Sequence, residues 1–72
     1  MQNKKLLCPV MIIEEENWVV AKDINSEVAS QGKNISEAMK NLKEALELYY
    51  EDASTPIENQ SKVFLTTMEV TV

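Results

Sequence analysis

The chain has 72 residues, of which 44% are hydrophobic and 26% are charged, a composition that fits one small soluble globular domain and excludes a disordered segment. Twelve acidic residues against seven basic ones give a net charge of −5, which argues against direct nucleic-acid binding and membrane adhesion but is compatible with a basic protein partner. A single cysteine excludes an internal disulfide. With one cysteine a reducing cytoplasm is the expected location, and no apolar run reaches the roughly 18 residues of a membrane span.

The first half of the chain predicts three strands. An apolar run over residues 6–13 contains Pro9, which would break a helix but is tolerated at the start or edge of a strand. Residues 18–24 predict a second strand, and the polar residues 14–17 between it and the first run predict a hairpin. Residues 27–31 predict a short third strand, ended by Gly32, the only glycine. We expect a positive φ at this glycine.

A helix follows over residues 35–51. Asn34 is a favourable N-cap, and Glu37 stands three residues later, as a capping box requires. Apolar residues recur in steps of three and four, which predicts one stripe facing a core. This stripe comprises Ile35, Ala38, Met39, Leu42, Ala45, Leu46 and Tyr49.

The end of the chain predicts a loop and a last strand. Residues 52–61 have the composition of a loop and include Pro56. In residues 62–72 apolar and polar positions alternate, which is typical of a half-buried strand. One face of that strand carries Phe64, Thr66, Met68, Val70 and Val72. The prediction is therefore a single α+β domain over residues 1–72 with the order β-β-β-α-β, in which one helix covers one face of an antiparallel-dominated sheet.

The second face of such a sheet needs a cover. Residues 6–13 contain no polar side chain, so both faces of the first strand are apolar. A sheet with one covering layer normally shows polar residues on its open face, and contiguous apolar surface usually marks an interface. We therefore expect a homodimer or higher oligomer. In the alternative, the loop over residues 52–61 folds across the open face.

The residues that carry most enzymatic chemistry are missing or scattered. There is no histidine, and one glycine cannot make a phosphate-binding loop. Cys8 stands alone in an apolar strand, as a buried hydrophobe does. Asp23 is the only acid in the interior of the first three predicted strands, since Glu27 is the first residue of the third, and a single acid does not hold a catalytic metal. We expect no enzymatic activity, no metal and no cofactor; a residual metal-dependent nuclease built on Asp23 is a weaker alternative.

The stretch "WVVAKDINSEVASQGKNISEAMKNLKEALELYYED", residues 18–52, resembles the HicB family of bacterial and archaeal antitoxins. The closest part is "SQG", a capping residue and "SEAMKNLKEALELYYE", and the terminal "MEVTV" is similar to the last strand of that family. The likeness runs from about residue 7 to residue 72, as in a UPF0150-like single-domain member. It implies a degraded RNase H-like fold without a nuclease site.

The resemblance also implies a function. A HicB protein neutralises a HicA toxin, a small basic ribonuclease that cleaves messenger RNA, by covering its active site. Many HicB proteins add a C-terminal DNA-binding domain, whereas this sequence stops at Val72 on a predicted strand, so we expect no operator binding by this chain alone. The family often has a proline and a further glycine after the second strand, where this sequence has "DINSEV". The alternative function is a stand-alone oligomeric structural or ligand-binding module without a toxin.

The partner-binding residues expected from this resemblance lie on the second strand, in the turn after it and in "SQG". They are Trp18, Lys22, Asp23, Glu27, Gln31 and Gly32. Trp18 is the best anchor, because interface energy concentrates in aromatic residues and arginine; the alternative is a core position at the strand edge. The acids Asp23, Glu27 and Glu14 to Glu16 could pair with basic toxin residues or form a solvated edge. Gly32 could serve only the turn.

Overall fold

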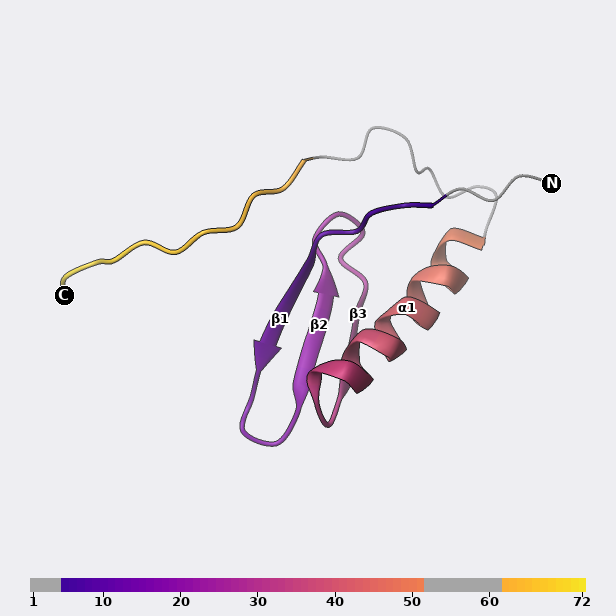
Figure 1. Ribbon diagram of the computed structural model, residues 1–72, viewed down its shortest axis with the longest axis horizontal. Helices are drawn as coiled ribbons and strands as arrows, with labels where there is room; N and C mark the ends of the chain where they lie inside the picture. Colours follow the sequence, from indigo (N-terminus) through magenta and orange to yellow (C-terminus); the bar gives the residue numbers. More distant parts are fainter. Residues whose placement is uncertain (1–4, 52–61) are drawn as a thin grey trace.

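The computed structural model describes residues 5–51 and 62–72 of the chain. Three strands, β1 (Val10–Glu14), β2 (Val19–Asp23) and β3 (Ala29–Gly32), form an antiparallel sheet in the order β1-β2-β3, and the helix α1 (Ile35–Glu51) follows. The helix lies against one face of the sheet (Figure 1). The architecture is therefore α+β with the order β-β-β-α. No helix in the described ranges combines the length and apolar character needed to cross a membrane.

The first strand is shorter than its apolar run. It begins at Val10 rather than near residue 6, directly after Pro9, because proline has no N–H to donate to a ladder. The carbonyl of Pro9 still accepts a hydrogen bond from the N–H of Ile24 at 2.8 Å. Pairing then runs from Val10 opposite Asp23 to Glu14 opposite Val19, which confirms the predicted hairpin.

The core lies between β2 and the helix. Val19 and Ala21 point to the same side of β2, since successive side chains alternate, and they pack with Ala38, Leu42 and Leu46. These five residues are the buried hydrophobic core among the described residues. The partly buried residues packed around this core are Cys8, Val10, Val28 and Tyr50.

The predicted helical stripe is wider than the buried one. Ala38, Leu42 and Leu46 are buried as expected, whereas Ile35, Met39 and Tyr49 are exposed. The reason is the narrow sheet beneath: the helix contacts β3 and β2 and leaves β1 largely uncovered. Residues at the margins of the stripe are therefore only partly covered in the described part of the chain.

The start of the helix is capped as predicted. The Oδ1 atom of Asn34 accepts a hydrogen bond from the N–H of Glu37 at 2.8 Å. Glu37 reaches back and its Oε1 accepts from the N–H of Lys33 at 2.6 Å, one residue before the position that a standard capping box would satisfy.

Two details at the third strand correct the sequence prediction. Gly32 belongs to β3 and has no positive φ; the left-handed conformation is taken by Glu27, with φ 67°. Gly32 is instead needed for close approach, because a Cβ atom there would lie 2.6 Å from the backbone nitrogen of Ala38. The strand starts at Ala29 rather than residue 27, because residues 24–27 make the turn from β2.

The predicted last strand is not paired in the single chain. Residues 62–72 are extended but belong to no strand or helix, and all except Val63 are exposed. They run away from the sheet (Figure 1). A strand needs a neighbouring edge for its backbone hydrogen bonds, and this segment has none among the residues described. The predicted loop over residues 52–61, and its possible packing across the sheet, lie outside the described residues.

Candidate functional site

The sheet face opposite the helix takes no part in the core. Pairing places Met11, Ile13, Val20, Lys22, Ala29 and Gln31 on this face, because they alternate with the buried residues of β2 and align across the three strands. We call this set the open face. Its centre is apolar, with Ile13 38% exposed and Met11 and Val20 partly buried. Among the described elements only α1 packs on the sheet, and it packs on the opposite side.

Trp18 stands at one end of the open face. It directly precedes β2 and, two residues before Val20, it shares that side by strand alternation. Its side chain is 49% exposed. The carbonyl of Trp18 accepts a hydrogen bond from the N–H of Glu15 at 2.8 Å, which closes the β1–β2 turn. The indole therefore sits beside a turn that carries three exposed carboxylates, those of Glu14, Glu15 and Glu16.

Two polar side chains predicted from the sequence also lie on the open face, Gln31 near the Trp18 end and Lys22 at the opposite end. Lys22 stands between Met11 and Ala29, and Gln31 stands beside Val20. Lys22 is partly buried and Gln31 is exposed. Together with Trp18, these are the predicted partner-binding residues that the structure brings to one surface.

Asp23 does not belong to that surface. It is fully buried on the helix side of β2. Its Oδ2 atom accepts hydrogen bonds from the N–H of Ser26 at 3.0 Å and from the Ser26 hydroxyl at 2.5 Å. Its backbone N–H donates to the carbonyl of Val28 at 2.9 Å. Asp23 is therefore placed to shape the β2–β3 turn, and the expectation that it pairs with a partner's basic residues does not fit its burial.

Glu27 and Gly32 also lie outside the open face. Glu27 is exposed in the turn after β2, in the left-handed conformation noted above, and its N–H donates to the carbonyl of Asp23 at 2.8 Å. Gly32 lies opposite Val19, beneath the first turn of α1. Of the six predicted residues, the sheet thus brings Lys22 and Gln31 together with Trp18 and separates the other three.

Sequence reasoning missed the apolar half of this surface. Met11 and Ile13 were part of an uninterrupted apolar run, which does not reveal the face to which each side chain points. The sequence of the second strand does indicate the two faces, because Val20 and Lys22 alternate with Val19 and Ala21. Aligning the two strands across their hairpin assigns Met11 and Ile13 to the open face.

The lone thiol does not form a reactive centre. Burial, followed by the nearby charge of Asp23, raises the pKa of Cys8 above its ordinary value. The thiolate is the nucleophilic form, so both effects make Cys8 less reactive near neutral pH. Within residues 5–51 and 62–72, no group of three or more histidine, cysteine, aspartate or glutamate side chains is arranged to hold a metal ion.

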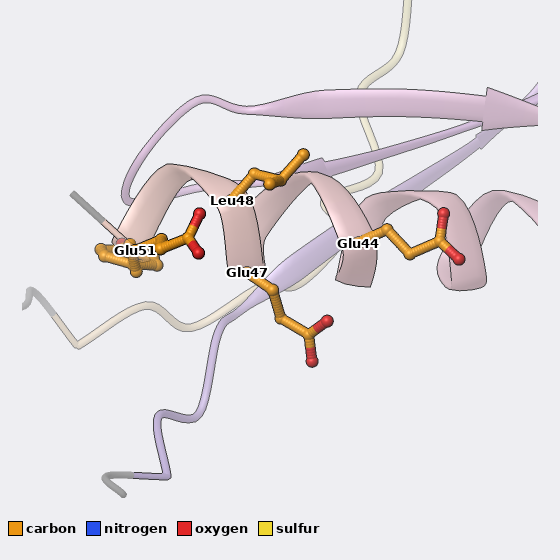
Figure 2. A pocket seen from close by; sticks show the side chains of 5 residues that line it. Glu44, Glu47, Leu48 and Glu51 are labelled. Carbon is orange, nitrogen blue, oxygen red and sulfur yellow. The ribbon is translucent and has the colours of Figure 1, made fainter. Parts of the chain in front are cut away.

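A shallow hollow occurs at the C-terminal part of the helix. It is lined by Glu44, Glu47, Leu48, Tyr50 and Glu51. Figure 2 shows the carboxylates of Glu44 and Glu47 extending in different directions rather than converging on one point. The hollow therefore offers an acidic, solvated surface, and its geometry does not favour a bound cation.

Comparison with known proteins gives a family and no activity. A family model described as a family of unknown function (DUF7387) matches residues 9–71. No curated protein and no solved structure matches the chain.

Proposed function

Because the chain belongs to the DUF7387 family, whose function is unknown, we propose a function from its surface: it is a non-catalytic cytoplasmic binding protein that inhibits a HicA-type ribonuclease toxin. The observation that carries this proposal is the open face, an apolar sheet surface with Trp18 at one end and the carboxylates of Glu14, Glu15 and Glu16 beside it. A half-exposed indole next to these three carboxylates, which we call the acidic turn, is suited to binding a basic protein.

The proposed mechanism is steric cover. Trp18 and Ile13 supply apolar contact, and the acidic turn attracts the basic surface with which a HicA-type toxin binds RNA. Burial of apolar area contributes about 25 cal/mol per Å², while the charges mainly speed association and select the partner. Bound in this way, the chain keeps messenger RNA out of the toxin's active site. The resemblance of residues 18–52 to HicB antitoxins supports this choice of partner. The same resemblance supports a degraded RNase H-like fold for this chain.

Co-expression tests the proposal. A HicA-type toxin encoded in the same genome is induced with and without this chain, and we expect growth only when the chain is present. Trp18→Ala and Ile13→Asp should each abolish the protection. The matched control is Leu48→Asp, which places the same acid at a residue that is 70% exposed on the helix; it should protect fully. Loss of growth with the unmodified chain, or protection that survives both open-face substitutions, would contradict the proposal.

A second function is favoured by one specific observation. Residues 62–72 expose several large apolar side chains, among them Phe64 and Met68 at 88% and 85%. Exposed apolar surface of this kind usually serves association. A stand-alone self-assembling module is therefore the alternative, and the absence of growth rescue combined with a stable oligomer would favour it.

A further inference from the structure

The C-terminal segment has the pattern of a strand without the pairing of one. Phe64, Met68, Val70 and Val72 alternate with residues of the opposite side, and their side chains are each at least two-thirds exposed. We call residues 62–72 the arm. Its backbone is extended and outside every sheet among the described residues, and its apolar face is exposed. Such a segment is ready to add to a sheet edge.

The edge of β1 can receive the arm. Because the sheet order is β1-β2-β3, one side of β1 faces no other strand in the described part of the chain. The helix contacts β2 and β3 and leaves the helix side of β1 largely uncovered beyond Val10, which packs against the core. Ile12 points to this side, opposite the buried Ala21, yet it is 37% exposed. A strand beside β1 would continue the sheet and bring new apolar side chains next to Ile12.

The helix contributes the other wall of this receiving site. Asn41 faces β3, since its Nδ2 atom donates to the carbonyl of Gln31 at 2.9 Å. Residues two apart on a helix point to nearly opposite sides, so Met39 lies on the flank away from β3. Met39 is 40% exposed. The apolar face of the arm would pack between Ile12 below and Met39 above.

The other edge of the sheet is less suited to the arm. The same Asn41 side chain occupies the carbonyl of Gln31 in β3, and α1 lies over that strand. Covering an edge in this way is a common protection against strand addition. Of the two edges, β1 is therefore the one that remains available for a further strand.

The course of the arm indicates whether the strand that pairs with β1 comes from the same chain or from a second copy. Lys62, Val63 and Phe64 line a hollow with Leu7, Cys8 and Pro9, just before β1 begins. From there the arm runs away from its own sheet rather than along β1 (Figure 1). We propose that the arm adds as a fourth strand to β1 of a second copy, whose own arm is returned to the first, in a two-fold exchanged dimer.

Cysteine cross-linking tests this exchange in the chain alone, without a toxin, so its failure would leave the proposed inhibitory function standing. In a Cys8→Ser background, one full-length chain carries Ile12→Cys at the centre of β1 and another carries Met68→Cys at the centre of the apolar face of the arm. After the two are mixed, a short bifunctional maleimide should give a covalent heterodimer on a denaturing gel. Pairing Ile12→Cys with Leu48→Cys, on the exposed side of the helix, should not.

A double variant with both cysteines in one chain separates exchange from folding back. If it yields only intrachain links and the unmodified protein is monomeric by light scattering, the arm closes on its own sheet and the proposal is wrong. Absence of any link in the mixture would overturn it equally. In addition, Val70→Asp should weaken the dimer roughly tenfold or more, because a charge would enter the apolar contact. Thr71→Asp, the neighbour on the other side of the arm, should weaken it much less.

Discussion

At Gly32 the last residue of β3 passes the first turn of α1 so closely that no side chain fits. A Cβ atom would lie 2.6 Å from the nitrogen of Ala38 and 2.8 Å from the carbonyl carbon of Glu37. Both are backbone atoms, which cannot turn aside as a flexible side chain can. The glycine thus sets the distance at which the helix packs on the sheet.

Gly32→Ala should therefore destabilise the fold. Forcing an extra methyl group into a packed site costs about 1 to 3 kcal/mol, which is a large share of the stability of so small a domain. Urea unfolding followed by circular dichroism measures the loss. Ala29→Gly, at an exposed position of the same strand, is the control and should cost less; an unchanged midpoint for Gly32→Ala would contradict the close-approach explanation.

Asp23 shows why a residue type alone misleads. A carboxylate in a strand of an acidic protein suggests an ion-pairing surface, and the resemblance to HicB proteins predicts that Asp23 pairs with basic residues of a partner. The structure instead buries it and gives its Oδ2 atom the N–H and hydroxyl of Ser26. Asp and Ser three residues apart before a turn are a known local pattern, so this role could have been predicted from residues 23–26.

At the scale of elements, the helix depends on its first turn. The Asn34 side chain satisfies the N–H of Glu37, one of the four donors that a helix leaves unpaired at its start. Asn34→Ala should cost about 1 kcal/mol of stability, and Asn34→Ser, which keeps an acceptor, should cost much less. Chemical denaturation of the two variants compares them directly. Equal stabilities would show that the cap contributes nothing here.

Element types were predictable, whereas bounds and partners were less so. The helix and the three strands follow from period, capping and turn composition, which are local properties. The start of β1 depended on the missing N–H of Pro9, and the limited burial of Met39 depended on the width of a three-stranded sheet. The clear alternation in residues 62–72 predicts a half-buried strand; alternation, however, does not say which edge a strand joins, or in which molecule.

The site was predictable to the same degree. Trp18, Lys22 and Gln31 were selected from residue type and from family resemblance, and the strand pairing places them on one side of the sheet. Glu27 and Gly32 were selected for the same reasons but lie in a turn and under the helix. Which face a residue occupies depends on register, and register is fixed by pairing between strands rather than by any one segment.

At the scale of the whole molecule, the net charge of −5 should govern the encounter with a basic partner. Attraction between exposed charges is screened over about 8 Å at physiological ionic strength and over 3 Å at 1 M salt. We therefore expect the association rate with a HicA-type toxin to fall about tenfold or more between low and high salt, while the dissociation rate changes little. Stopped-flow measurements over a salt series check this. An association rate independent of salt would argue against a role for the acidic turn.

Trp18 is the only tryptophan in the chain, and its half-exposed position at the end of the open face makes it a natural optical reporter. Indole emission moves to shorter wavelength when water is displaced from the ring. A ligand that binds to the open face and covers Trp18 should shift the emission of the unlabelled protein to shorter wavelength. Strand pairing along β1 should leave the emission spectrum nearly unchanged. One emission scan can thus separate the two kinds of contact without attaching a dye.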